Sequence, residues 1–392
     1  MSGFRPLAGR RVLDLTSSLA GPYCTQVLGA LGADVVKVEH PGRGDEARAW
    51  GPDFAAEGSV MFFAANAGKR SLALDLSTAE GREALLRLAE NAAVLVQSLR
   101  PGTAERLGLG PDDLRARNPE LVYCSIGAYG RRGPLAAQPG YDPLMQAAGG
   151  IMSVTGEPDR PPVRVGASVV DLGTAVWTAL AVVAALLEGG GRVLDLSLYE
   201  TTLALLPYQL TNSLATGQVA GRHGTAFPLI VPYQVFATRD GELMVVAGND
   251  RLFRSLCRVL GAPELADDER FATNPRRLEN RQLLIPELER RFAAQPSAVW
   301  LERLVEAGVP AAPVHDVAQV AASEQTRALG ILQELGGYRT VSLPFSADGV
   351  RVDYGSPPPL LGEHSVELLG QAGYSEAEIA DLAARGITLR RV

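Results

Sequence analysis

Residues 11–39 read RVLDLTSSLAGPYCTQVLGALGADVVKVE. The apolar runs 12–15 and 34–38 have the length and the branched side chains of buried strands. The stretch between them, from Pro22 to Leu31, has the spacing of a helix. A strand, a helix and a second strand in this order predict a βαβ unit, in which the two strands lie parallel.

The same alternation continues along the next 160 residues. Further apolar runs, separated by helical patterns, lie at residues 71–74, 93–96, 121–125 and 193–196. Two long segments rich in alanine and leucine, 172–187 and 199–215, are predicted to be core helices. Strands separated by helices predict an α/β fold with a mostly parallel sheet that is covered on both faces.

The pattern changes after residue 216. A polar connector with glycines, 217–224, precedes two alternating strands that bracket Asp240-Gly241, which is a strong hairpin signal. Charged helical patterns follow. We therefore predict a smaller α+β domain at 225–325, joined by connectors 217–224 and 326–329 to a larger domain that is made of residues 1–216 and 330–392.

Composition limits the class of protein. The 392 residues carry a net charge of −7, which disfavours nucleic acid and anionic membranes as partners. We expect no apolar run of the roughly eighteen residues that a bilayer span needs, and no secretory signal is recognised. The three cysteines, Cys24, Cys124 and Cys257, form no CxxC pair and are interpreted as reduced packing residues. These features predict a cytoplasmic protein.

Several kinds of catalytic site lack their sequence motifs. The first turn, residues 16–22, has no GxGxxG for a nicotinamide cofactor, and there is no GxSxG nucleophile elbow. The histidines are scattered without an HExxH motif, so no metal site is predicted; they are His40, His223, His315 and His364. Catalysis must then rely largely on carboxylates, amides and hydroxyls.

Asp171 is an acidic residue among small and apolar neighbours, just before the helix predicted from Leu172. One interpretation is an N-cap, whose carboxylate accepts hydrogen bonds from the first amides of the helix. The other is a nucleophile, because a helix start in a dry cleft can hold a carboxylate ionised. The residues alone leave both interpretations open.

Separated segments of the chain share their order with a known family. They are VLDLT (12–16), AGP (20–22), LGADVVKVE (31–39), Gly44-Asp45 with Arg48, Asn66, KRSLALDL (69–76), RPG (100–102), GYD (140–142), GASVVD (166–171), DLSLYE (195–200) and GND (248–250). Together they resemble the family III CoA transferases, which include carnitine, formyl and bile-acid CoA transferases. The resemblance covers nearly all of the predicted larger domain and enters the smaller one.

This resemblance implies a Rossmann-like large domain built from both chain ends, a small central domain and an interlocked homodimer. It places the nucleophile on Asp171, adds Tyr141 to the catalytic site and assigns Gly248 and Asn249 to a mobile lid. The implied substrates are an acyl-CoA and a carboxylic acid, with no permanently bound cofactor. In the family mechanism the aspartate forms first a mixed anhydride and then an aspartyl-CoA thioester.

The resemblance also implies a path for CoA along the larger domain. Its adenine and phosphates are expected near His40, Leu74, Leu99 and Arg106, and its pantetheine near Leu19 and Ala20. Further candidates for phosphate contact are Lys69, Arg70 and Arg100, although each is equally well interpreted as a solvated charge at a loop end.

One departure from the family narrows the expected substrate. Leu19 stands where the formyl-CoA and oxalate enzymes have glutamine, so we expect an apolar acyl group or a larger dicarboxylate rather than formate or oxalate. Two alternatives remain open. A racemase of the same fold would need a histidine where this chain has Tyr141, and tyrosine is a poor base at neutral pH. A non-catalytic CoA-binding homologue would keep the fold without turnover.

Overall fold

The computed structural model describes residues 3–51, 53–55 and 58–391. The chain forms two compact units. The larger comprises Met1–Ile151, Arg164–Thr216 and Gln325–Val392, and the smaller comprises Met152–Val163 and Gly217–Glu324.

Two boundaries differ from those predicted from the sequence. The segment Met152–Val163 belongs to the smaller unit, where Gly224 donates a backbone hydrogen bond to Gly156. The predicted connector 326–329 is the last part of the helix α16 (Glu324–Leu329). Residues 324–329, at the second boundary, contain no glycine or proline that would mark it in the sequence, whereas 152–163 contain Gly156 and three prolines.

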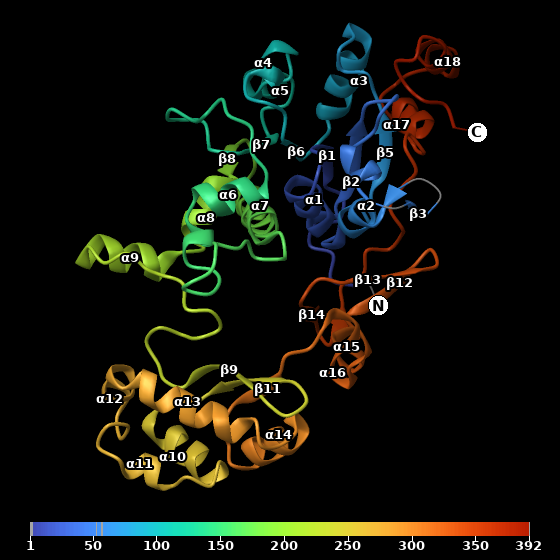
Figure 1. Ribbon diagram of the computed structural model, residues 1–392. Helices are drawn as coiled ribbons and strands as arrows, with labels where there is room; N and C mark the ends of the chain where they lie inside the picture. The colour runs from blue at the N-terminus through green and yellow to red at the C-terminus, as the bar shows by residue number, and fades with distance from the viewer. Residues whose placement is uncertain (1–2, 52, 56–57, 392) are drawn as a thin grey trace. The chain divides into compact units, whose positions relative to one another are not determined.

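The larger unit is built on a six-stranded sheet in which every strand pair is parallel. Its spatial order is β5 (Arg70–Ala73), β2 (Asp34–Glu39), β1 (Arg11–Leu15), β6 (Val94–Gln97), β7 (Val122–Gly127) and β8 (Val193–Ser197) (Figure 1). The predicted α/β class with a parallel sheet is confirmed. Because the chain runs outward from β1 in one direction and from β6 in the other, the strand order reverses between these two strands.

Helices cover both faces of this sheet. On one face, α1 (Ala20–Ala30) and α7 (Val169–Glu188) pack against each other and over Val12 and its counterparts on neighbouring strands. On the other face, Leu13 and its counterparts pack against α3 (Ala79–Ala89), α5 (Pro111–Arg117), α17 (Ser365–Gln371) and α18 (Glu376–Ala384). Successive residues of β1 thus enter opposite cores, as the two-residue period of a strand requires.

Helix α7 begins earlier than predicted. Its first helical residue is Val169 and its N-cap is Ser168, so Asp171 lies in the first turn and the N-cap interpretation of Asp171 is wrong. By length and composition α7 is also apolar enough to cross a membrane, which overturns the expectation that no segment is. A core helix meets the same criteria, and Ala175, Ala179 and Val182 are buried against the sheet.

Shorter elements complete the larger unit. They are η1 (Glu46–Ala49), β3 (Asp53–Ala55), β4 (Gly58–Ser59), α2 (Val60–Ala65), α4 (Thr103–Arg106), α6 (Asp142–Ala148), α8 (Leu198–Ala204), α9 (Pro207–Thr216), β12 (Leu332–Leu335), β13 (Tyr338–Val341), β14 (Ser346–Ala347) and β15 (Val350–Arg351). The turn η2 (Ile151–Ser153) lies where the chain passes from the larger to the smaller unit.

The smaller unit has a three-stranded antiparallel sheet in the order β11 (Ala311–Pro313), β10 (Glu242–Val246), β9 (Tyr233–Ala237). The hairpin predicted around Asp240-Gly241 is confirmed by the pairing of β9 with β10. Its helices are α10 (Asp250–Val259), α11 (Glu264–Asp267), α12 (Asn274–Glu279), α13 (Arg281–Phe292), α14 (Ser297–Glu306) and α15 (Val317–Ala322).

Arg277 is a fully buried cation in this unit. Its guanidinium donates to the carbonyl oxygens of Val231, at 2.6 Å, and Phe271, at 2.9 Å. It also donates to the carboxylate of Asp250 at 2.8 Å. One side chain thus joins α12 to two loops and to the first turn of α10.

Replacing Arg277 with methionine is expected to lower the free energy of unfolding by about 2–4 kcal/mol, because buried carbonyls lose their donors. Urea denaturation of the full chain measures this loss. The neighbouring Arg276 pairs with Glu279 on the surface, so Arg276→Met is the matched control and should change stability by less than about 0.5 kcal/mol. Equal effects of the two variants would contradict the prediction.

Candidate active site

A pocket of about 1200 Å³ opens at the carboxyl edge of the large sheet. Residues at or just after the end of each of the six strands line it: Leu15, Glu39, Leu74, Ser98, Gly127 and Leu198. The loops that follow β1 and β6, between which the strand order reverses, both contribute lining residues, 16–18 and 98–101. Parallel α/β sheets bind ligands at such a position, because the two loops diverge and leave a crevice.

Asp171 lines this pocket from the first turn of α7. The helix start is capped by another residue: one carboxylate oxygen of Asp142 accepts hydrogen bonds from the backbone amides of Val170, at 2.8 Å, and Asp171, at 3.1 Å. Ser168, the N-cap residue, makes no capping hydrogen bond with its side chain. Asp142 therefore fixes the backbone that carries Asp171.

Asp142 is itself held by Gln146, one turn later on α6. The Gln146 side chain donates to the second carboxylate oxygen of Asp142 at 2.6 Å and accepts from the backbone amide of Val165 at 2.8 Å. Both side chains are buried. The sequence analysis missed this pair as functional residues, although their spacing of four in a helix was the available signal.

The environment of Asp171 favours its neutral form. Burial, with a further contribution from the negative charge of Asp142, raises the pKa of Asp171 to about 7. This direction is opposite to the one expected for a carboxylate at a helix start, because Asp142 occupies the first amides of α7. Above pH 7 the ionised carboxylate is poorly solvated and more basic than an ordinary aspartate, which suits a nucleophile.

Asp171→Asn is expected to stabilise the protein at pH 8 by about 1–3 kcal/mol, reduced from the full pKa shift because the carboxyl group is partly exposed. The folded-state pKa lies above the ordinary value of 3.8. Ionisation therefore costs the wild type stability as pH rises from about 4 to about 7. Urea denaturation should show a gain at pH 8 that shrinks at pH 5. A gain that does not change with pH would contradict this origin.

Tyr141 also lines the pocket, at the N-cap position of α6. Its hydroxyl donates weakly to the carboxylate of Glu46, at 3.4 Å, and its ring lies edge-on to Trp50 at 6.4 Å between centroids. The negative charge of Glu46 and partial burial raise the pKa of Tyr141. The phenol therefore stays protonated at neutral pH and can donate a hydrogen bond but not act as a base.

Most of the predicted CoA contacts meet in this pocket. Five of the predicted contacts line it together with Asp171 and Tyr141: Ala20, His40, Leu74, Leu99 and Arg100. Arg106 is exposed on α4, where it donates to Thr103, and its neighbours Thr103 and Leu107 are lining residues. Arg43 is a further lining cation that the sequence analysis did not select.

Lys69 was predicted to contact phosphate, and its position contradicts this. The side chain is fully buried, and its ammonium group donates to Asp14, to the carbonyl of Pro22 and to Asn66. All three donors of the ammonium group are thus used inside the core. Lys69 thus stabilises the start of α1 from within the core and has no hydrogen-bond donor left for a ligand.

Arg70 and Leu19 also lie outside the pocket wall. Arg70 begins β5, at the amino edge of the sheet, where it pairs with Asp34 and Glu367. Leu19 is the N-cap residue of α1, and its buried side chain is not among the lining residues. The predicted phosphate contact of Arg70 and the argument against oxalate from Leu19 therefore lose their basis.

Gly248 and Asn249 lie in the smaller unit, between β10 and α10. The Asn249 side chain caps α10 by accepting from the amide of Leu252 at 3.0 Å. On the other side, the amide of Ala247 donates to the carbonyl of Pro232 at 3.0 Å. The backbone is thus anchored on both sides of Gly248.

Residues 7–365 match the family model described as CoA-transferase family III. The chain belongs to CoA-transferase family III. This family III transferase is 38% identical to the succinyl-CoA:glutarate CoA-transferase of Mus musculus, over 98% of the chain and 90% of the relative. It is 39% identical to the acetyl-CoA:oxalate CoA-transferase of Acetobacter aceti, over 95% of the chain and 97% of the relative.

A solved structure of a CAIB/BAIF family protein from Brucella suis resembles the transferase with a TM-score of 0.87. The two are 38% identical, and the match covers 95% of this chain and 100% of the other. The family and fold implied by the sequence segments are thus confirmed, and the chain is a CoA transferase whose substrates are CoA thioesters and carboxylic acids.

Proposed function

We propose that this family III transferase moves CoA from an acyl-CoA to a carboxylic acid through covalent intermediates on Asp171. The observation that carries the proposal is the position of Asp171. It lies in the wall of the large pocket at the strand-order reversal, on a helix start that Asp142 fixes, with a raised pKa. The family resemblance assigns the nucleophile to this same residue.

In the first half of the reaction, a carboxylate oxygen of Asp171 attacks the thioester carbonyl of the donor. The carbon–sulfur bond breaks and CoA leaves as a thiolate, which gives a mixed anhydride. The thiolate then attacks the side-chain carbonyl of Asp171 and expels the donor acid as its carboxylate. The product of this half is an aspartyl-CoA thioester.

In the second half, the acceptor carboxylate attacks the aspartyl thioester and expels the CoA thiolate, which forms a second anhydride. The thiolate attacks the acceptor carbonyl and releases Asp171 as a carboxylate. One thioester is exchanged for another, so the reaction is nearly balanced in energy. The anhydrides must be protected from water, and we propose that Gly248 and Asn249 belong to a lid that provides this protection.

The charged residues of the pocket support a proposal for its ligands. His40, Arg43 and Arg100 line it and Arg106 lies beside it, and these groups are suited to the phosphates of CoA. Two relatives are named for transfer to glutarate or oxalate, both dicarboxylic acids. We therefore propose a dicarboxylic acid as the acceptor, with succinyl-CoA or acetyl-CoA as the first donors to test.

The test is peptide mass analysis after incubation with succinyl-CoA and acetyl-CoA, with hydroxylamine to trap activated carboxyl groups. A hydroxamate on Asp171 is expected, and Asp171→Ala should show none. If no adduct forms with any donor while the α-proton of a 2-methylacyl-CoA exchanges with deuterium, the racemase alternative replaces this proposal. If neither occurs although CoA binds, the chain is a non-catalytic CoA-binding homologue.

We also infer that two copies associate, as the family resemblance implies. Large apolar side chains are highly exposed on elements of the larger unit, among them Trp177 on α7 and Leu214 on α9. Helix α9 has no buried residue. Light scattering should give a mass near twice that of one chain, and a monomer at micromolar concentration would refute this. The cytoplasmic location stays a prediction.

A further inference from the structure

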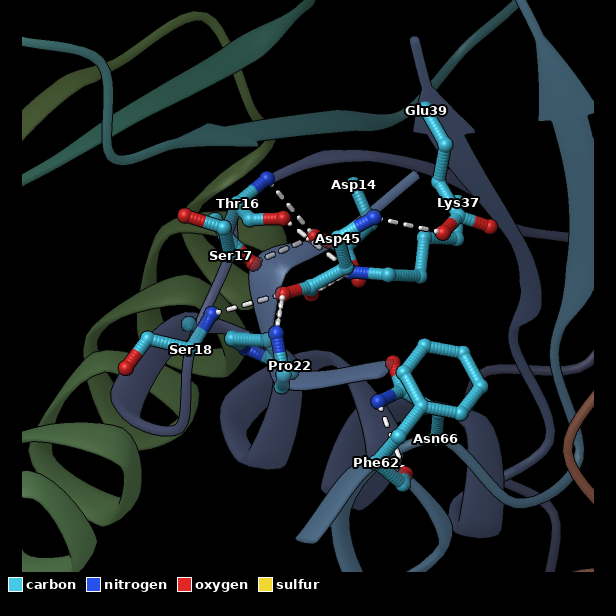
Figure 2. A network of polar contacts seen from close by, with 12 residues as sticks. Asp14, Thr16, Ser17, Ser18, Pro22, Lys37, Glu39, Asp45, Phe62 and Asn66 are labelled. Carbon is cyan, nitrogen blue, oxygen red and sulfur yellow. Dashed lines mark hydrogen bonds and ion pairs between the residues drawn. The ribbon is translucent and has the colours of Figure 1, made fainter. Parts of the chain in front are cut away.

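Four charged side chains lie buried close to the turn that follows β1, residues 16–18. Figure 2 labels three of them, Asp14, Lys37 and Asp45. The four form two ion pairs: Lys69 with Asp14 at 2.9 Å and Lys37 with Asp45 at 2.7 Å. None of the four side chains has exposed surface. Buried ion pairs contribute little net stability, because desolvation of the charges offsets their attraction. Their presence close to a pocket therefore requires another explanation.

The first pair serves the core. Lys69 uses its three donors within the core, and Asp14 accepts from the hydroxyl of Thr25 on α1 at 2.7 Å. Asp14 also accepts from the amide of Thr16 at 3.0 Å. These contacts join β1, α1 and the loop before β5 to one another.

The second pair reaches the pocket wall. The ammonium group of Lys37 donates to the carbonyl oxygen of Thr16 at 3.0 Å, and a carboxylate oxygen of Asp45 accepts from the amide of Ser18 at 3.1 Å. Figure 2 shows Asp45 between Lys37 and Ser18. Thr16, Ser17, Ser18 and Asp45 all line the pocket. The pair thus holds the two peptide groups on either side of Ser17.

The backbone at this turn needs such support. Ser18 has a φ of 74°, a left-handed conformation that is uncommon for a residue other than glycine. The amide of Ser17 donates to the hydroxyl of Ser98, across the strand-order reversal, at 3.2 Å. Burial opposes the charge of Lys37, but Asp14, Asp45 and Glu39 outweigh the effect of burial and raise the pKa of Lys37, so Lys37 stays charged.

We propose that Lys37 and Asp45 are positioning residues for acyl-CoA, because they fix the turn 16–18 in the shape that the thioester-bearing substrate contacts. The inference rests on the proposed function, since it takes the pocket as the acyl-CoA site. The pair acts on substrate binding through the turn and does not touch the reacting atoms. Its loss should therefore change KM more than kcat.

The main test variant is Lys37→Met with Asp45→Asn, which removes both charges and keeps an amide oxygen for Ser18. The KM for succinyl-CoA, or whichever donor modifies Asp171, is expected to rise at least tenfold while kcat changes less than threefold. The control is Leu88→Ala, a truncation in the core on the far side of the sheet. It should lower the melting temperature at least as much and leave KM unchanged.

A second variant provides the test if Lys37→Met with Asp45→Asn does not fold. Ser18→Val leaves both ion pairs in place but disfavours the left-handed backbone, so KM should again rise at least fivefold. If KM stays within twofold of the wild type in either folded variant, the inference is overturned. Mass analysis of Asp171 separates the two proposals. If the wild type forms the adduct but the variants keep its KM, only the positioning role of Lys37 and Asp45 is refuted. If the wild type forms no adduct, the proposed function is refuted.

Discussion

Replacement of Asp171 with asparagine is expected to lower kcat for CoA transfer by about 10⁴-fold or more, because the amide cannot form the anhydride. Chromatographic separation of donor and product CoA thioesters measures the loss. CoA binding should persist, since the substitution adds no bulk to the pocket. Asp195→Asn is the matched control, because Asp195 pairs with Arg131 outside the pocket, and it should retain wild-type activity.

One outcome would contradict this prediction. Activity of Asp171→Asn within tenfold of the wild type would mean that the carboxylate does not carry the intermediate. Slow deamidation restores aspartate and imitates residual activity, so the mass of the variant should be checked after the assay.

Asp142→Asn is expected to lower kcat/KM at pH 8 by about 10–100-fold, because the first turn of α7 loses its charged cap and the nucleophile shifts. Removal of the negative charge should also lower the pKa of Asp171. In the wild type kcat/KM is expected to rise as Asp171 ionises near pH 7. In the variant this rise should move to lower pH by about one unit. A pH profile between 5 and 9 measures both effects.

The control for this charge effect is Gln146→Leu. It removes the hydrogen bond to Asp142 but keeps the charge beside Asp171. Activity should fall while the midpoint of the pH profile stays in place or rises. If Asp142→Asn leaves the midpoint unchanged, the charge of Asp142 does not reach the nucleophile, and burial alone raises the pKa of Asp171.

Periodicity predicted the main framework because the physical signal is local. The apolar runs at β1, β2 and β6 have the length and the branched side chains that are typical of buried strands. The glycines at 189–191 end α7 as expected. The Asp240-Gly241 hairpin likewise follows from the two residues of the turn. Family resemblance then supplied the significance of Asp171, which composition and spacing alone left ambiguous.

Tertiary surroundings decided what the sequence could not predict. Lys69 and Arg100 are both cations near loop ends, yet one is buried under α1 and the other lines the pocket. Asp171 was interpreted as the N-cap of α7, but it lies in the first turn of this helix. The carboxylate that caps α7 belongs to Asp142, which lies 29 positions before Asp171 in the chain. Contacts between distant segments carry no local pattern, so the ion pair of Lys37 with Asp45 was not predicted either.

The way the C-terminal helices complete the large sheet affects the order of folding during synthesis. Leu368 and Leu369 of α17 and Leu382 of α18 belong to the core that covers β1 and β2. The smaller unit is complete once residue 324 has emerged from the ribosome. Helices α3 and α5 cover only part of this apolar face of the first strands, and the rest stays uncovered until the last helices are made. Chaperones that shield nascent chains should therefore bind the N-terminal third longest.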